Sequence, residues 1–364
     1  MGIRVLVKLL DIVWGLISVI PAILAVGGFL ASRFHPARHM ELQWLGLFLP
    51  LVLGINMVLI VYWIGRRKFW FVIPFLAVLI NIPYLSGIIQ WPFKQMKTAE
   101  RELIVATYNI QQLPAGDMSA IGRETGGCMY NGKIDLLCIQ EFPGAGDAQL
   151  KLIDEISGFL PYYAVHSSSP QDMHIALFSR YPILQSQKII FPDESSNTAM
   201  WAVLDIDGQV VKVFNAHLQT TNLNQNRIRP SDNIDRAASR IIRLKDMMNE
   251  NGVIRARQAD LIRTLIDEST CPVIVCGDFN DTPASYAYRK IKGNLEDSFR
   301  SCGKGYGYTY RYLRKLFRID YVFYSRDVFR GIRYYSPDLE YSDHKPVIVG
   351  LDLDPTPLSS EGRN

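Results

Sequence analysis

The sequence predicts a two-part chain, in which a bundle of three transmembrane helices precedes one α/β (α+β) domain. Three observations support this prediction. Residues 12–93 contain three long apolar runs without a charged residue in any of them. From about residue 100 the apolar runs become short and rich in Val and Ile, which is typical of strands. Helical periodicity then appears at residues 236–249 and 256–268.

The three uncharged runs are residues 12–31, 42–64 and 69–93. Each is near the ~20 residues that a helix needs to cross a bilayer. Three such runs, separated only by short charged links, favour membrane spans over buried helices of a large soluble core. A signal peptide fits the first run poorly, because the apolar core of a signal peptide has only ~7–15 residues. We expect a multi-pass integral membrane protein whose Asn56 and Asn81 hydrogen-bond between helices.

Basic residues in the short links predict how the chain is oriented. The densest cluster, Arg66–Lys68, lies between the second and third runs, and Arg4 and Lys8 precede the first run. The positive-inside rule places these residues in the cytoplasm. An odd number of spans then predicts that the domain after the third run is extracytoplasmic.

Polar side chains stand at or beside the ends of the short apolar runs in the second part of the chain. One such residue is more often an ordinary turn residue. Six such positions on one chain favour a shared cleft, because unpaired polar groups are costly to bury. These positions hold Asn109, Glu141, His217, Asp278 with Asn280, Asp320, and Asp343 with His344.

These residue types suit metal-assisted hydrolysis of a phosphoester. Carboxylate and amide oxygens are the ligands that Mg²⁺ or Mn²⁺ prefers, and the five cysteines form no CxxC pair that would indicate zinc. Two of the positions are histidines, and no convincing Ser or Cys nucleophile motif accompanies them. This combination indicates direct attack by water, with a cation and an imidazole stabilising the phosphate charge.

Seven short motifs in order resemble the endonuclease/exonuclease/phosphatase superfamily, which has the deoxyribonuclease-I-like fold. They are "TYNIQ", "CIQEF", "FSRYPI", "NAHLQ", "CGDFND", "RIDYVF" and "SDHKPV". The resemblance covers roughly residues 101–353 and implies a four-layered sandwich, with two mixed β-sheets flanked by helices. The predicted organisation is a membrane domain at 1–97, a catalytic domain at 98–354 and a disordered tail at 355–364.

The resemblance also implies a metal site. Glu141 matches the metal-binding glutamate of the family, Asn109 the asparagine beside the metal and the phosphate, and Asp343 a second acid near the metal. The expected cofactor is Mg²⁺ or Mn²⁺.

The other matched positions have catalytic roles in the family. His217 matches a general acid or phosphate stabiliser, and Asp278 the aspartate that aligns or deprotonates the attacking water. Asn280 matches an amide that holds a phosphate oxygen. His344 matches the histidine that contacts the scissile phosphate, and Asp320 the carboxylate that pairs with this histidine.

The sequence departs from the family pattern in two places. His174 stands near a position where many members have a glycine–asparagine pair, and we favour a packed histidine over a site residue. Residues 218–257 form a longer arm than compact members have, with a separate helix expected near Arg255. A basic lid and a solvated surface helix are both open interpretations of this arm, whose arginines are Arg227, Arg229, Arg236, Arg240 and Arg243.

A second basic stretch, "TYRYLRKLFRID", leads into Asp320. Its charges and aromatic rings could grip a phosphate and stack on a base or a lipid headgroup, or they could simply face outward. A salt bridge with Arg318 is the alternative to a histidine partner for Asp320.

The function predicted from these observations is a membrane-anchored, Mg²⁺- or Mn²⁺-dependent phosphoester hydrolase of the phosphodiesterase or nuclease type. Its substrate is a nucleic acid, a lipid headgroup or a small phosphate ester, and the sequence does not choose among them. One alternative is a sphingomyelinase-like or phosphoinositide-phosphatase-like lipid headgroup hydrolase. An alternative of another class is a catalytically inactive membrane scaffold. The lipid bilayer is an expected partner, and no protein partner is inferred.

Overall fold

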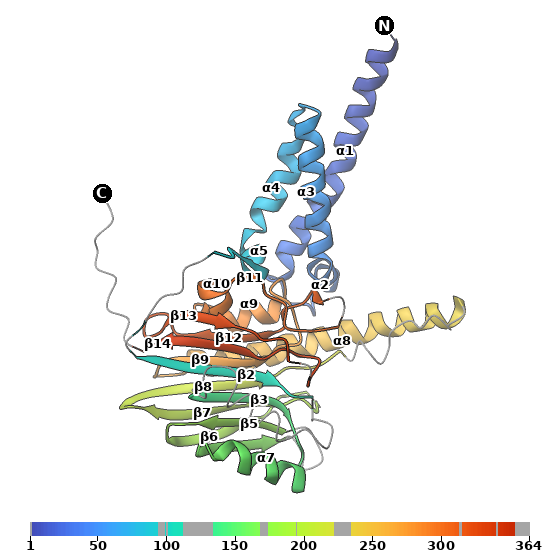
Figure 1. The fold of residues 1–364 in the computed structure, drawn as a ribbon. Coiled ribbons are helices and arrows are strands. Elements are labelled where there is room, and N and C mark those ends of the chain that lie inside the picture. The colour runs from blue at the N-terminus through green and yellow to red at the C-terminus, as the bar shows by residue number, and fades with distance from the viewer. Residues whose placement is uncertain are drawn as a thin grey trace. The chain divides into compact units, whose positions relative to one another are not determined.

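The computed structural model describes residues 2–93, 99, 101–111, 134–167, 174–193, 195–221, 234–312, 315–339 and 341–353 (Figure 1). The contacts divide the chain into two compact units. A helical unit comprises Met1–Ser86 with Thr282–Arg289, and a sheet unit comprises Gly87–Asp281 with Lys290–Asn364.

One helix of the first unit is by itself long and apolar enough to cross a membrane, over Val5–Ala31. Two bent helix pairs qualify only if each pair counts as one span: the first bends by 61° after Leu47 and the second by 58° after Ile80. The three-helix membrane bundle therefore stays a prediction. The helical elements here are α1 (Gly2–Ala31), α2 (Met40–Leu47), α3 (Leu49–Gly65), the 3₁₀ turn η1 (Phe69–Phe71), α4 (Val72–Ile80) and α5 (Ile82–Ile88).

The second and third apolar runs are not the single helices expected at about 42–64 and 69–93. Phe48 interrupts the second run with φ −86° and ψ 3°, and α3 then begins with a proline in its first turn. Proline is tolerated there, because the N–H groups of the first turn have no partner within the helix. The third run is helical only to Ile88, because residues 89–90 form a strand instead. The predicted end at residue 93 is therefore wrong.

Polar side chains form hydrogen bonds between helices of this unit. Nδ2 of Asn56 donates to the carbonyl of Pro21 (3.0 Å), and Nδ2 of Asn81 donates to that of Ala25 (3.1 Å). These bonds confirm the expected contacts between helices. Near the start of α1, the buried carboxylate of Asp11 pairs with Arg66 (2.6 Å) and Lys68 (2.9 Å), which places the basic link beside this end of α1.

The second unit is built from two six-stranded sheets. Each sheet is mixed, because β2 and β3 are parallel in one and β8 and β9 are parallel in the other, while the remaining neighbours are antiparallel. The first sheet has the order β13 (Arg330–Tyr335), β14 (Val347–Asp352), β2 (Glu102–Asn109), β3 (Leu136–Phe142), β5 (His174–Ser179) and β4 (Tyr162–Ser167). The second has the order β10 (Glu296–Asp297), β12 (Asp320–Tyr324), β9 (Val273–Asp278), β8 (Gln209–His217), β7 (Ala199–Ile206) and β6 (Ile183–Ile189).

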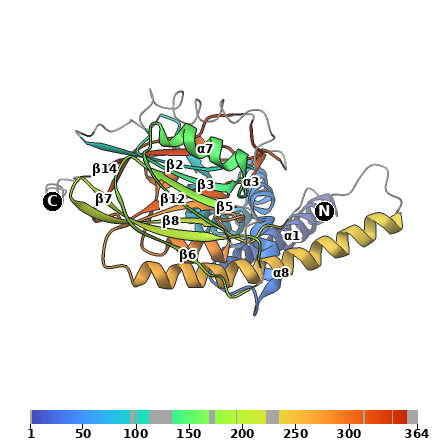
Figure 2. The same cartoon turned by 90° about the horizontal axis from the view of Figure 1, so that it is seen from below.

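Helices cover the outer faces of the two sheets (Figure 2). Helix α7 (Asp147–Ser157) lies over the first sheet and α8 (Ile234–Asp267) over the second, so the unit has the four layers that were predicted. Alternation along β2 shows how one strand serves two cores. Leu103 and Val105 belong to a buried cluster that both sheets share, whereas Ile104 and Ala106 belong to a cluster that includes side chains of α7.

Helix α8 is longer than the sequence patterns indicated. The expected separate helix near Arg255 is wrong, because one continuous helix runs from Ile234 to Asp267. The segment contains no proline, and a single glycine costs only about 1 kcal/mol in a helix. Residues 222–233 of the predicted arm, with Arg227 and Arg229, lie outside the described residues, as does the predicted tail.

The smaller elements complete the chain. A separate two-stranded sheet pairs β1 (Ile89–Gln90) with β11 (Gly305–Tyr306). The short helices α9 (Tyr286–Lys292) and α10 (Ser298–Cys302) follow β9 and β10.

Candidate active site

The sheet topology brings the predicted site residues to one edge. In the first sheet, Asn109 ends β2 and Glu141 lies near the end of β3, its parallel neighbour. In the second sheet, His217 ends β8 directly opposite Asp278 at the end of β9. Asp320 begins the antiparallel strand β12, also opposite Asp278. Parallel neighbours end at the same edge of a sheet, so the two pairs of strand ends meet where the sheets face each other.

Asn109 links the two sheets through its side-chain amide. Its Nδ2 donates to Oε1 of Glu141 (3.0 Å) in its own sheet and to Oδ2 of Asp278 (3.0 Å) in the other. The side chain is only 1% exposed. One buried amide therefore sets the separation of two carboxylates that would otherwise repel each other.

Asp278 lies at the centre of the cluster. Its Oδ1 accepts a hydrogen bond from the backbone N–H of Asn280 (2.8 Å). Its Oδ2 lies 3.7 Å from Nε2 of His217 and 3.6 Å from Nε2 of His344. Burial raises the pKa of Asp278 above its ordinary value, and the positive charge of His344 opposes this rise.

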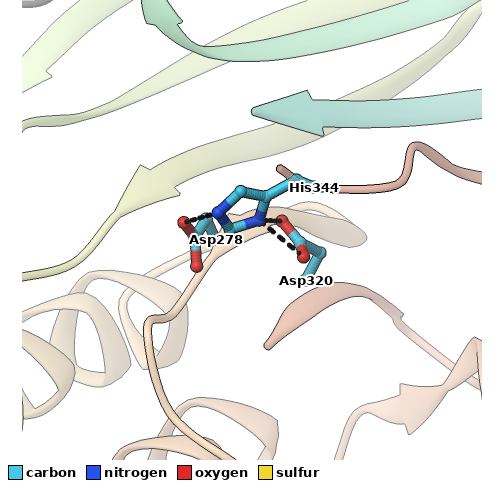
Figure 3. A group of neighbouring side chains, drawn as sticks. All are labelled: Asp278, Asp320 and His344. Atoms are coloured by element: carbon cyan, nitrogen blue, oxygen red, sulfur yellow. Dashed lines mark hydrogen bonds and ion pairs between the residues drawn. The ribbon is translucent and has the colours of Figure 1, made fainter. Parts of the chain in front are cut away.

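His344 is held between two carboxylates (Figure 3). Its Nδ1 lies 3.1 and 3.0 Å from the two oxygens of Asp320, and its Nε2 lies 3.8 Å from Oδ1 of Asp343 as well as near Asp278. Burial by itself would lower the pKa of His344. The carboxylates of Asp320 and Asp278 outweigh burial and raise this pKa to about 10, so that the imidazole is protonated at neutral pH.

Arg318, the alternative partner considered for Asp320, forms an ion pair with a different acid. Arg318 makes two bonds with Asp297, Nη1 to Oδ1 (2.9 Å) and Nη2 to Oδ2 (2.5 Å), and both side chains are buried. Asp320 is bonded to His344 instead. The two acids in this region thus have separate cationic partners.

His217 has the opposite electrostatic environment. Its side chain is 3% exposed, and its Nε2 has no hydrogen-bond partner among the described residues. Burial lowers the pKa of His217 to about 4; Asp278 opposes this shift and the charge of His344 adds to it. The imidazole is therefore neutral at neutral pH, and its unpartnered nitrogen faces Glu141 (3.7 Å) and Asp278. A bound group would complete the hydrogen bonding of this nitrogen.

Backbone conformation also sets the site. Glu141 and Asn280 both have φ of +51°, which costs non-glycine residues about 1–3 kcal/mol each. Gly277, just before Asp278, has φ of +144°, and a Cβ there would lie 1.9 Å from the carbonyl oxygen of Ala216. Only glycine fits at this position, because β8 runs close beside it.

A second layer of buried polar side chains lies beneath the site, and the sequence motifs did not single it out. Nδ2 of Asn215 donates to the carbonyls of Ile139 (3.1 Å) and Ala176 (2.8 Å) in the opposite sheet. Its Oδ1 accepts from Nε2 of Gln140 (2.6 Å), which also donates to Thr107 (2.9 Å). Asn215 and Thr107 stand two residues before His217 and Asn109, so the period-two alternation of strands was the available signal.

The donor set fits a hard cation. Glu141, Asp278 and Asp343 bring excess negative charge to one place: burial raises the pKa of Asp343, as do the charges of Glu141 and Asp278, although His344 opposes them. Ligand atoms of Asp278, Asp320 and His344 lie within 4.8 Å of one another. Of these, His344 is a poor ligand, because a protonated imidazole has no lone pair to offer. Oδ1 of Asn109 accepts a hydrogen bond from the N–H of Gln111 (3.0 Å).

His174 and the basic residues before β12 make contacts outside this cluster. His174 is buried, and its Nδ1 lies 2.7 Å from Nε2 of Gln149 on α7, in agreement with a packed histidine. In the basic stretch before β12, Arg311 pairs with Asp338 (2.5 Å) and Lys315 lies 3.5 Å from the same acid. Arg314 lies outside the described residues.

The predicted residues thus form one connected cluster, whose chemical roles stay predictions. Contacts join Asn109, Glu141, Asp278 and His217, and then His344 with Asp320 and Asp343. Asn280 is bonded to Asp278, and its Nδ2 donates to the carbonyl of Leu218 (3.0 Å).

Comparisons with known proteins agree with the fold. A search of curated protein sequences gave no match. Among solved structures, D. rerio TDP2 humanized by 14 mutations has a TM-score of 0.50 at 17% identity, over 69% of this chain and 99% of that one. An endonuclease/exonuclease/phosphatase from Bacteroides vulgatus has a TM-score of 0.50 at 19% identity, over 70% of this chain and 100% of that one. These identities show similarity of fold alone.

Two family models match the sequence. The model described as "Domain of unknown function (DUF8431)" matches residues 9–88, and that of the endonuclease/exonuclease/phosphatase family matches residues 106–344. The second match spans well over half of the chain and contains the whole cluster from Asn109 to His344. The chain therefore belongs to the endonuclease/exonuclease/phosphatase family.

Proposed function

We propose that this protein is a membrane-anchored phosphoester hydrolase that depends on Mg²⁺ or Mn²⁺ and uses water as the nucleophile. The observation that carries the proposal is the single network of the eight predicted side chains at the meeting edge of the two sheets. It combines clustered carboxylates for a hard cation with two histidines in opposite charge states, which is a suitable environment for a phosphate group.

The acidic side of the cluster would hold the metal. Glu141 and Asp343 would be ligands, with Asn109 beside them, and the bound cation would neutralise phosphate oxygens. Asp278 would align and deprotonate the attacking water. Asn280 would donate its side-chain amide to a phosphate oxygen in exchange for its bond to Leu218.

The two histidines would have different roles toward the phosphate. His344 would supply a fixed positive charge that Asp320 orients and maintains, since its pKa is raised to about 10. His217 would supply its neutral Nε2, which has no partner among the described residues. The lowered pKa of His217 favours stabilisation of a phosphate oxygen over the role of general acid.

Membrane anchoring is supported by the span Val5–Ala31. We propose that the two bent helix pairs complete a three-span anchor and that the sheet unit is extracytoplasmic, as the basic link Arg66–Lys68 indicates. A reporter fused after the last residue tests the orientation. Activity of a reporter that works only in the cytoplasm would contradict it.

Hydrolysis assays on the full chain in detergent test the function. The substrates would be bis(p-nitrophenyl) phosphate, p-nitrophenyl phosphate, single- and double-stranded DNA, RNA, sphingomyelin and phosphoinositides, with Mg²⁺ or Mn²⁺ present. We expect hydrolysis of at least one substrate, and we expect EDTA to abolish it. His217→Gln should lower kcat/KM roughly 10²- to 10⁴-fold.

The matched control is His166→Gln on β4, which alters a partly buried histidine outside the cluster, bonded to Ser186 (3.2 Å). It should leave the rate unchanged. Full activity of His217→Gln would refute the assigned role of this residue. Absence of hydrolysis across the whole panel would favour the inactive scaffold.

A further inference from the structure

A short strand pair ties the start of the sheet unit to the segment before β12. In this pair, Ile89 lies opposite Tyr306 and Gln90 opposite Gly305, and the N–H of Gly307 donates to the carbonyl of Ile88 (2.9 Å). The chain enters β1 directly from α5, which ends at Ile88. The pair therefore begins one residue after an apolar helix.

Large apolar side chains are exposed along these two paired segments. Trp91 is 71% and Phe93 is 80% exposed, and the others are exposed by 41–53%. Single exposed apolar residues are common on soluble proteins, but an exposed group marks an interaction site. We call this group the aromatic rim: Ile89, Trp91, Phe93, Tyr306, Tyr312 and Leu316.

Contacts join the two halves of the aromatic rim. The hydroxyl of Tyr306 donates to the carbonyl of Leu316 (2.5 Å), and its ring lies 6.3 Å from that of Tyr308. Ile89 is paired directly opposite Tyr306, so these two side chains lie on the same face of the strand pair and join the two segments.

Cations border the rim. The ammonium group of Lys315, on an exposed side chain, lies 5.6 Å from the ring centroid of Tyr308, and that of Lys345 lies 4.2 Å from it. Asp338 pairs with Arg311 and Lys315. These two cations share one acid among the described residues, so this part of the border carries net positive charge, whereas Lys345 is buried.

The same segment supports the candidate active site. Oγ1 of Thr309 accepts hydrogen bonds from the N–H groups of Ile319 (3.0 Å) and Asp320 (3.1 Å). Tyr310 forms a backbone bridge with His344, and the two rings are 5.2 Å apart. A molecule bound to the aromatic rim would therefore lie beside the segment that contacts Asp320 and His344.

We propose that the aromatic rim of the sheet unit lies against the surface of a bilayer containing anionic phospholipid. Trp and Tyr side chains favour the headgroup level of a membrane, because one end is apolar and the other polar. Lysine ammonium groups near such a surface are attracted to anionic headgroups. The chain reaches the rim directly from α5, and its border has the complementary charge. The inference rests on membrane anchoring and is independent of hydrolysis.

Spin labels on the full chain in nanodiscs test this placement. Cys128 and Cys271 would be replaced by Ser, and single labels placed at Tyr312→Cys and Leu316→Cys. Matched labels at Leu150→Cys on α7 and Leu184→Cys on β6 occupy positions that are 63% and 58% exposed. Power saturation compares collisions with oxygen, which concentrates in lipid, and with a water-soluble nickel complex.

We expect the ratio of oxygen to nickel collisions to be several-fold higher at both rim labels than at both control labels. Water-like ratios at the rim labels would overturn the proposal. So would shielding of these labels from both reagents, which would indicate a protein partner, or equally high ratios at the control labels.

Charge is tested in the same system. Lys315→Glu should lower the ratio at Leu316→Cys in nanodiscs of phosphatidylcholine with phosphatidylserine, and much less in phosphatidylcholine alone. Lys151→Glu on α7 makes the same charge change and should have no effect. A loss that is equal in both lipids would exclude the attraction to anionic lipid. These readouts involve no hydrolysis, so failure of the proposed enzyme activity and failure of this inference are distinguishable.

Discussion

The imidazole of His344 is bonded through Nδ1 to both oxygens of Asp320, at 3.0 and 3.1 Å, and both side chains are buried. A carboxylate in this position fixes the ring orientation and stabilises the imidazolium. Nε2 then points toward Asp278, 3.6 Å away. The pair explains how a buried histidine keeps a positive charge at the edge where the two sheets meet.

Replacing this carboxylate should discharge the histidine. In Asp320→Asn, the pKa of His344 should fall from about 10 toward its ordinary value of 6.5, because burial then acts with less opposition. We expect kcat/KM above neutral pH to fall roughly 10²-fold. NMR of labelled histidine side chains in the metal-free protein measures the pKa. Asp327→Asn, at an exposed position, is the control. An unchanged pKa of His344 would show that Asp320 does not maintain its charge.

The two histidines predict opposite effects of pH on stability. The pKa of His344 is raised, so its contribution is complete below pH 6.5 and is lost as pH rises toward 10. The pKa of His217 is lowered, so its contribution is present above pH 6.5 and is lost as pH falls toward 4. Each slope should be on the order of 1 kcal/mol per pH unit. Thermal unfolding with chelator present measures both, and His344→Gln should flatten only the alkaline limb.

Metal binding should stabilise the folded protein through the acidic residues. Millimolar Mg²⁺ or Mn²⁺ should raise the unfolding midpoint by several degrees, because a ligand that binds only the folded state adds to its stability. Glu141→Gln and Asp343→Asn should each remove most of this rise. Glu296→Gln, elsewhere in the sheet unit, should not. If the metal still raises the unfolding midpoint fully in both site variants, other residues bind the metal.

The sequence was sufficient to identify side chains that the fold brings together, because the signal for each of them is local. Each predicted residue stands at or near the end of a strand or just before one, and Asn109, His217 and Asp278 end parallel strands. A polar residue after an apolar run is visible without any knowledge of the partner strands. Parallel neighbours end at the same edge of a sheet, so the pairing of β2 with β3 and of β8 with β9 is enough to bring these side chains together. The pairing of Arg318 with Asp297 could not be predicted, because Asp297 belongs to a two-residue strand, β10, that no apolar run marks in the sequence.

The parts that were missed depend on contacts between distant segments. Strand β1 was taken as the end of a helix, since only its pairing with β11 makes it a strand. Helix α8 was divided at a polar stretch that weakens helical periodicity without breaking the backbone hydrogen bonds. The bends at Phe48 and Asn81 follow from prolines whose effect on an apolar helix is set by neighbouring helices.

Asn215 is bonded across the sheets to the strand that carries Glu141. The pairing of β3 with β5 shifts between Ile139 and Phe142, where Glu141 adopts its positive φ. Nδ2 of Asn215 binds the carbonyls of Ile139 and Ala176 beside this shift. Without these bonds the carbonyls lose their cross-sheet donor, which costs about 1–3 kcal/mol. Glu141 should then be held less firmly.

We therefore expect Asn215→Ala to lower both the unfolding midpoint and the additional rise that Mn²⁺ produces. Thr107→Val is the matched control, since it removes a hydroxyl from the same buried layer but leaves the carbonyls of Ile139 and Ala176 bonded. It should lower the midpoint while preserving the Mn²⁺ response. If both variants keep the full response to Mn²⁺, the buried layer stabilises the fold without positioning Glu141. A loss confined to Asn215→Ala would identify this residue as the support of the metal site from the opposite sheet.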